Sequence, residues 1–278
     1  MAKAGDKAIL YDSTLCTACR GCQAACKEWN EDDEGAGEKT VNTGSYTNPP
    51  DLSPKTWLTM LFQEVEKDGQ LRWLFGRRSC MHCTDAGCVR ACPDHALYYH
   101  EAGFVAYNKS ICTGCGYCVD ACPFKVPRLT RNALTGIALM DKCTFCTTLG
   151  LNRVDEGWEP ACVKSCPPRA LRYGNWSDMV AEGKKHVETL KAKGHSNAYL
   201  YGENEVGGTH VLYVLDDAPE RYGLPANPRV SAATVVWKGI LQPVGWALGG
   251  LTILGLGLNY IVARESKLAR ERLAGKKE

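Results

Sequence analysis

Residues 112–123 read CTGCGYCVDACP, in which four cysteines are separated by two, two and three residues and a proline follows the last of them. Residues 16–26 have the same spacing, and residues 80–93 widen the middle gap to four residues. A fourth group, residues 143–167, places fifteen residues in that gap and again ends in Cys-Pro. These four groups contain all sixteen cysteines of the chain. The cysteines therefore form a repeated functional pattern.

A cysteine run of this spacing holds [4Fe–4S] clusters in bacterial ferredoxins. Three cysteines on a tight loop bind three irons of one cluster, and the fourth, on a short helix, points toward a neighbouring cluster. Two runs therefore exchange their fourth cysteines. With four runs, the sequence predicts four [4Fe–4S] clusters rather than a disulfide framework, which is typical of short secreted chains.

The order of the groups predicts how they pair. Groups two and three are nearest neighbours in the sequence, which leaves groups one and four as the other pair. The spacing defines the three-cysteine part of each ligand set, whereas the exchanged fourth ligand depends on this pairing. The predicted sets are set A (Cys16, Cys19, Cys22 and Cys166), set B (Cys143, Cys146, Cys162 and Cys26), set C (Cys80, Cys83, Cys88 and Cys122) and set D (Cys112, Cys115, Cys118 and Cys92).

Other metal centres fit the cysteines less well. Taken alone, the fourth group resembles a zinc ribbon, and zinc stays open as an alternative for that group. Attachment of haem c requires a histidine directly after C-x2-C, and the sequence has none there. A Rieske centre requires two histidine ligands. Only His82 lies between paired cysteines, so we interpret it as a loop residue that at most tunes a cluster.

The composition excludes several classes of protein. The chain has 278 residues, of which 45% are hydrophobic and 23% charged, as in globular proteins. A formal net charge of +2 excludes a strongly basic nucleic-acid-binding protein and a protein with an acidic tail. The first residues, MAKAGDKAILYDSTLC, contain neither an apolar signal segment nor a twin-arginine pair, so we expect no cleavable signal.

The fold class is predicted to be α+β, with two interleaved ferredoxin-like modules of two [4Fe–4S] clusters each and one C-terminal transmembrane helix. The predicted parts are an outer module (1–75 and 130–232, with an insertion at 27–79), an inner module (76–129), a transmembrane anchor (233–265) and a basic tail (266–278). The insertion either covers a metal site, docks a partner or is a solvent-exposed elaboration. The pattern alone leaves these possibilities open.

Local patterns predict the smaller elements. The expected strands are 57–65 with 71–75, 98–100 with 104–107, 137–140, and 209–215. A helix is predicted at 177–192, with Ser177 as its N-cap.

Residues 244–263 read VGWALGGLTILGLGLNYIVA and contain no charged residue. As a helix this segment would span about 30 Å, the thickness of the hydrocarbon core of a bilayer. Trp237, Trp246 and Tyr260 suit the two membrane interfaces, and the glycines would be poor in a buried core helix. The segment is followed by Arg264, Lys267, Arg270, Arg272, Lys276 and Lys277. The positive-inside rule then puts the C-terminus in the cytoplasm and the iron–sulfur domain in the periplasm.

In its four cysteine groups the chain resembles the electron-transfer (beta) subunits of molybdopterin-oxidoreductase complexes. It is most similar to the beta subunit of membrane-bound respiratory formate dehydrogenases. The stretches that carry this resemblance are TGSY at 43–46, NPPDLS at 48–53, CMHC at 80–83, EPACVKSCP at 159–167, EVGGTHV at 205–211 and WK at 237–238. The resemblance covers residues 8–262, and the basic tail after residue 263 departs from it.

The resemblance implies a subunit that transfers electrons and is not itself catalytic. Its partners would be a molybdopterin (Mo or W) catalytic alpha subunit that oxidises formate, and a membrane cytochrome b gamma subunit that passes electrons to quinone. Set A would lie nearest the catalytic subunit and set D nearest the membrane haem. The missing signal fits export as a folded complex through a partner's twin-arginine signal. The alternative functions are the electron-transfer subunit of a membrane-bound hydrogenase or of another molybdopterin oxidoreductase, and a free polyferredoxin carrier.

Overall fold

The structure is a computed structural model that describes residues 2–30, 41–67, 69–132, 134, 136–148, 151–231, 236 and 240–274. Two compact units divide the chain, Met1–Ser231 and Ala232–Glu278. The acidic part of the predicted insertion at 31–35, the hairpin residue Asp68, the pair at 237–238 and the last lysines of the basic tail lie outside the described residues. The division of the first unit into an outer and an inner module stays a prediction.

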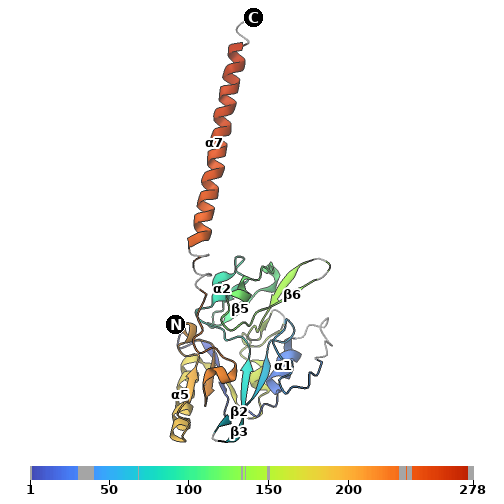
Figure 1. Ribbon diagram of the computed structural model, residues 1–278, viewed down its shortest axis with the longest axis vertical. Helices are drawn as coiled ribbons and strands as arrows, with labels where there is room; N and C mark the ends of the chain where they lie inside the picture. The colour runs from blue at the N-terminus through green and yellow to red at the C-terminus, as the bar shows by residue number, and fades with distance from the viewer. Residues whose placement is uncertain are drawn as a thin grey trace. The chain divides into compact units, whose positions relative to one another are not determined.

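A four-stranded mixed sheet and one long helix form one side of the first unit (Figure 1). The strands are β1 (Lys7–Asp12), β10 (Leu171–Asn175), β11 (Tyr199–Tyr201) and β12 (Val211–Leu215), in the order β10-β1-β12-β11. Strand β1 is parallel to β12 and antiparallel to β10. The predicted strand at 209–215 is confirmed, whereas β1, β10 and β11 were not predicted.

The two faces of this sheet serve different cores because successive strand residues point to opposite sides. Leu10 and Leu212 face helix α5 (Trp176–Ala192), together with Met179 and Val187 of that helix. The alternate residues of β1 and β12 enter the main core, which also contains cysteines of sets A and B. The sheet therefore forms one wall behind the cysteine groups.

Helix α5 confirms the predicted helix at 177–192, but its predicted N-cap is wrong. The N-cap residue is Asn175, which ends β10 in an extended conformation with φ −68° and ψ 146°. Ser177 already lies inside the first turn, and its hydroxyl donates to the carbonyl of Ala4 at 3.1 Å. The chain passes directly from strand to helix, so no separate loop residue is left to act as the cap.

Four antiparallel hairpins complete the first unit. They pair β2 (Thr59–Lys67) with β3 (Gln70–Arg78), β4 (Leu97–Tyr99) with β5 (Val105–Tyr107), β6 (Arg128–Arg131) with β7 (Ala138–Asp141), and β8 (Thr147–Thr148) with β9 (Leu151–Asn152). The strands predicted at 57–65 with 71–75, at 98–100 with 104–107, and at 137–140 are confirmed, although β3 runs beyond residue 75 to Arg78. Short 3₁₀ turns occupy Lys109–Ile111, Glu205–Gly207 and Pro219–Tyr222.

Four helices follow the cysteine loops: α1 (Gly21–Asn30), α2 (Gly87–Ala91), α3 (Tyr117–Asp120) and α4 (Ala161–Lys164). In each group the third cysteine is the second residue of its helix. Helix α1 packs against α4, and α2 packs against α3. The groups thus pair in space as one with four and two with three.

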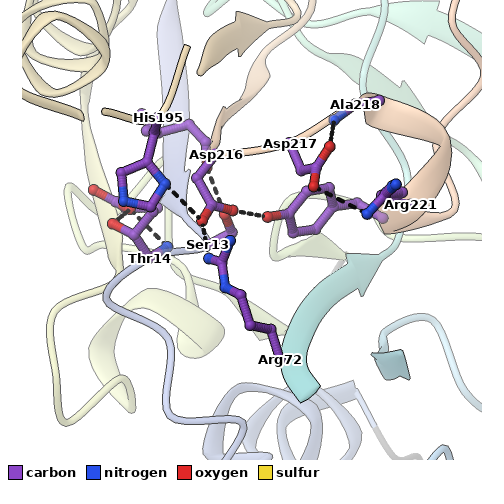
Figure 2. Close-up of polar contacts among 11 residues, drawn as sticks. Ser13, Thr14, Arg72, His195, Asp216, Asp217, Ala218 and Arg221 are labelled. Atoms are coloured by element: carbon purple, nitrogen blue, oxygen red, sulfur yellow. Dashed lines mark hydrogen bonds and ion pairs between the residues drawn. The ribbon is translucent and has the colours of Figure 1, made fainter. Parts of the chain in front are cut away.

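The hairpin β2–β3 of the insertion is fixed to the sheet by buried polar contacts. Figure 2 shows Asp216, which follows β12, beside Arg72 of β3 and His195. The hydroxyl of Tyr222 also donates to the carboxylate of Asp216. The Nδ1 atom of His195 lies 3.3 Å from the carboxylate of Asp216. In addition, the hydroxyl of Tyr11 donates to the carbonyl of Phe75 at 2.7 Å. The insertion hairpin is therefore part of the core and not a solvent-exposed elaboration.

The second unit contains helix α7 (Gln242–Ala274), which includes the predicted segment 244–263. Within this helix, Gln242–Leu268 has a mean hydropathy of 1.5 and is long and apolar enough to cross a membrane. None of that segment is buried against other described residues. The prediction of one long apolar C-terminal helix is confirmed.

Candidate metal centres

The cysteine loops share a backbone conformation that the sequence pattern does not reveal. In every group the residue two positions after the first cysteine has a positive φ: 52° at Ala18, 50° at His82, 67° at Gly114 and 61° at Phe145. The left-handed residue curls the loop so that its amide can face back toward the first cysteine. The amide of Ala18 accordingly donates to Cys16 Sγ at 3.3 Å, and that of Phe145 to Cys143 Sγ at 3.5 Å. Such bonds stabilise thiolates.

The thiols of set D surround one cavity. Its walls include Cys92, Cys112, Cys115 and Cys118, together with apolar side chains such as Leu97 and Met140. Cys92 comes from the second group, and the other three cysteines come from the third. The structure thus brings together all four cysteines predicted for set D.

The thiols of set A line a second cavity in the same way. Cys16, Cys19 and Cys22 of the first group meet Cys166 of the fourth group there, beside Met60. The sulfur of Met60 on β2 lies 3.7 Å from Cys22 Sγ. The insertion hairpin therefore packs against the cysteines of set A through Met60.

The cysteines of sets B and C are also neighbours, in buried surroundings. Burial raises the pKa of Cys26, and the nearby thiolates of Cys143, Cys162 and Cys146 raise it further. In set C, burial raises the pKa of Cys83, and the thiolates of Cys80, Cys122 and Cys88 add to this rise. The four sets are thus close together in space, while the assignment of these ligands to clusters stays a prediction.

The arrangement of the thiols fits [4Fe–4S] clusters. Each such cluster takes one thiolate on each of four irons, so its ligands stand around a cavity rather than converging on one point. The cavities of sets A and D have four thiols in their walls. Over the residues that the structure describes, no three His, Cys, Asp or Glu side chains form a group that could hold a single metal ion.

Contacts between the sets arrange them in a row. Burial raises the pKa of Cys22 in set A to about 12, and the thiolate of Cys162 in set B contributes. Burial likewise raises the pKa of Cys143 in set B to about 11, with the thiolate of Cys80 in set C as the next cause. Cys88 of set C packs in one apolar cluster with Cys118 of set D. These neighbouring thiols indicate the order A, B, C, D for the predicted sets.

The two ends of this row differ from its middle. Of the sixteen cysteines, all within the described residues, only Cys19 and Cys115 are exposed. Cys19 belongs to set A and Cys115 to set D. The cysteines of sets B and C are all buried or half-buried.

His82 is the loop residue that the sequence indicated, and it is fully buried between the rings of Phe104 and Phe145. Its Nδ1–H donates to the carbonyl of Val105 at 3.1 Å. Burial lowers the pKa of His82, and the neighbouring ammonium of Lys142 lowers it further, so the imidazole is neutral. Its position between Cys80 and Cys83 places it in the left-handed turn of the loop rather than in a ligand position.

Comparison with known proteins agrees with these centres. Models described as a 4Fe-4S dicluster domain match residues 71–176 and 15–96. The nitrate-inducible formate dehydrogenase iron-sulfur subunit of Escherichia coli K12 is 42% identical over 91% of this chain and 84% of the relative. The chain belongs to the family of formate dehydrogenase iron–sulfur subunits.

Two further relatives cover most of the chain, one of them from a hydrogenase operon. The formate dehydrogenase-O iron-sulfur subunit of Escherichia coli K12 is 41% identical over 95% of this iron–sulfur subunit and 88% of the relative. The hydrogenase-2 operon protein HybA of Escherichia coli O157:H7 is 34% identical over 90% of this chain and 84% of the relative. The 4Fe-4S dicluster domains and the sixteen cysteines of the subunit are consistent with four clusters.

Two buried cations lie among the thiols and were missed by sequence reasoning. Arg77 and Lys142 are each only 2% exposed. The ammonium of Lys142 donates to the carbonyls of Val105 and Cys143, each at 2.9 Å. Both residues are adjacent to cysteine groups in the sequence, but an isolated Arg or Lys there carries no signal of burial.

Proposed function

We propose that this subunit carries electrons from a molybdopterin-containing (Mo or W) catalytic subunit to a membrane cytochrome b subunit and quinone, and has no catalytic residue of its own. Its membership of the formate dehydrogenase family supports formate as the electron source in the complex. The predicted sets A, B, C and D would each hold one [4Fe–4S] cluster.

The observation that carries this proposal is the exposure of one thiol at each end of the row. Cys19 and Cys115 are exposed, whereas the cysteines of sets B and C are all buried or half-buried. A donor protein can then approach set A, and an acceptor can approach set D, without reaching the middle of the row. This is the arrangement needed by a carrier that links two partners.

The residues of the chain bind and insulate the centres. When bound, [4Fe–4S] clusters supply one-electron carriers whose potentials depend on charge, hydrogen bonds and solvent exposure. The cysteine thiolates would hold them, and the loop amides of Ala18 and Phe145 would stabilise the negative charge on sulfur. Phe104 and Phe145, stacked with their centroids 4.4 Å apart, exclude water from the centre of the unit.

Helix α7 is proposed to anchor the subunit in the membrane by a single pass. Its apolar segment is long enough to cross the hydrocarbon core, and Trp246 and Tyr260 near its ends suit the interfaces. Arg264, Lys267 and Arg270 follow the uncharged stretch 244–263, which favours a cytoplasmic C-terminus and a periplasmic iron–sulfur unit.

Variants of the exposed cysteines in sets A and D test the proposed direction of electron transfer along the row. In the purified complex, Cys115→Ser should leave reduction of the other clusters by formate intact and abolish quinone reduction. Cys19→Ser should impair both the reduction of the clusters by formate and the reduction of quinone. Each variant is therefore the control for the other. Electron paramagnetic resonance after addition of formate, combined with a quinone reduction assay, distinguishes the two. Normal quinone reduction by both variants would contradict the proposal.

A hydrogenase electron-transfer subunit is the second candidate, because HybA is 34% identical to this chain. The identity of 42% to a formate dehydrogenase subunit favours the first proposal. A further alternative is the electron-transfer subunit of another molybdopterin oxidoreductase. Mass spectrometry of the co-purified catalytic subunit separates them, because a hydrogenase would bring nickel and iron, and a formate dehydrogenase a molybdopterin.

A further inference from the structure

Arg77 has the largest side chain among those that are fully buried, and it comes from the insertion hairpin. Its backbone carbonyl accepts a hydrogen bond from the hydroxyl of Tyr213 at 2.8 Å, and its Nη1 donates to the hydroxyl of Ser79. Its Nη2 lies 3.7 Å from the Sγ of Cys162, a member of set B. The hairpin thus delivers a guanidinium directly to the cysteine groups.

Within the described part of the chain, no carboxylate neutralises this guanidinium. Among the described residues, the ion pairs do not include Arg77, and its buried Nε has no hydrogen-bond partner. A buried charge without a partner is strongly destabilising. The charge of Arg77 therefore requires negative groups of another kind.

The thiolates of two ligand sets are those negative groups. Burial lowers the pKa of Arg77, but the thiolates of Cys162, Cys22 and Cys143 and the phenol of Tyr213 raise it, and the net pKa lies above the usual value. Cys22 belongs to set A, and Cys162 and Cys143 belong to set B. Arg77 therefore contacts set B at Cys162 and is an electrostatic neighbour of set A through Cys22.

We propose that Arg77 is the shared counter-cation of sets A and B and raises the reduction potentials of the two clusters that these sets hold. This inference rests on the proposed function. Reduction by one electron from the donor partner adds one negative charge at a set, and a fixed positive charge a few ångströms away stabilises that reduced state. Because Arg77 stays protonated, this stabilisation does not require a proton to be taken up.

The adjacent residue provides a matched control. Arg78 follows Arg77 on β3 and points to the opposite face of the hairpin. Its guanidinium is partly exposed and pairs with Asp51 at 3.1 Å. Arg78→Gln removes the same charge from the same strand but leaves the buried cation in place.

The test is a potentiometric titration of the intact complex, followed by electron paramagnetic resonance. In Arg77→Gln, the ratio of reduced to oxidised clusters at a fixed potential should fall at least tenfold for two of the four signals, which corresponds to 59 mV for one electron. Arg77→Lys should keep both potentials near those of the native complex, because it retains the charge. Arg78→Gln should leave all four potentials unchanged.

Unchanged potentials in an iron-loaded Arg77→Gln complex would overturn the proposal, as would an equal shift in Arg78→Gln. If Arg77→Gln fails to load iron, Arg77→Lys decides. A loaded lysine variant with native potentials supports the requirement for a charge, whereas an unloaded one or one with lowered potentials refutes it. Failure of the proposed function is distinguishable, since formate would then leave the clusters of the native complex oxidised.

Discussion

Gly87 of α2 and the carbonyl oxygen of Ala121 are in such close approach that a Cβ atom on Gly87 would lie 2.4 Å from that oxygen. Gly21 of α1 has the same relation to the carbonyl of Ser165, at 3.0 Å. Each glycine precedes the third cysteine of its group, and each carbonyl belongs to the residue before the fourth cysteine of the paired group. The two pairs of helices are thus related by a common packing rule, which favours the exchange of fourth cysteines.

The first prediction follows from this contact. Gly87→Ala should force α2 away from α3 and destabilise the fold by about 1–3 kcal/mol, the usual cost of overpacking. Gly21→Ala should cost less, because its contact is looser. The measurement is the rate at which iron is lost on warming, with Gly5→Ala as the control because nothing lies within 4 Å of that position. Equal iron retention by Gly87→Ala and Gly5→Ala would contradict the close packing.

The second prediction concerns the exchanged ligand Cys26. Cys26→Ser should alter the cluster of set B, because the neighbours of Cys26 are Cys143, Cys162 and Cys146. The cluster bound by Cys16, Cys19 and Cys22 should keep its resonance signal, although these cysteines belong to the same sequence group. Loss of only that signal would mean that each group holds its own cluster without exchange.

The third prediction concerns the buried carboxylate that fixes the insertion hairpin. Asp216→Asn should lower the free energy of unfolding by about 1–3 kcal/mol, because Arg72 and Tyr222 lose a charged partner. Glu203→Gln, at the more exposed pair with Lys184, should cost no more than about 1 kcal/mol. Denaturant titration of the two variants measures the difference, and similar losses would refute the anchoring role of Asp216.

The pH dependence of this difference has a definite sign. Burial raises the pKa of Asp216, but hydrogen bonds from Tyr222 and Arg72 lower it, and the net pKa lies below the ordinary value. The stabilisation is then present above the unfolded pKa of about 3.9 and is lost as the pH falls through the folded value. The difference between native protein and Asp216→Asn should therefore not shrink as the pH falls from about 8 to about 5. A difference that shrinks in this range would contradict the lowered pKa.

The fourth prediction concerns the anchor. Truncation before residue 237 should leave a soluble, cluster-loaded chain that binds the catalytic subunit, because the core of the first unit is complete by residue 231. Formate oxidation with an artificial dye should persist, whereas quinone reduction should fail. Unchanged quinone reduction by the truncated complex would show that α7 is dispensable.

The cysteine spacing predicted much of the candidate site because each loop is local. The three cysteines of a loop lie within a few residues, so their chemistry is visible in the sequence. The contact of Arg77 with Cys162 is not visible in the sequence, because the two residues are 85 positions apart. Only the folded hairpin brings them together. The N-cap of α5 was also mispredicted from local sequence. The helix follows β10 directly, so the N-cap is Asn175 and not Ser177.

The mixed sheet was missed for a related reason. Residues 8–11 of β1 are all buried, so the strand lacks the polar alternation that marks a half-exposed strand. Its partner β12 is buried throughout and lies about two hundred residues later in the chain, as the pairing of Ile9 with Val211 shows. Only the helix on one face and the cysteine groups on the other explain why both sides of these strands are apolar.

The most direct test of the central claim is the iron, acid-labile sulfide and zinc content of the purified native subunit. Four cysteine sets that each hold one [4Fe–4S] cluster predict about sixteen irons and about sixteen sulfides per chain, with no stoichiometric zinc. About eight irons per chain, or one zinc ion in place of the cluster of set B, would contradict the row of four centres from set A to set D.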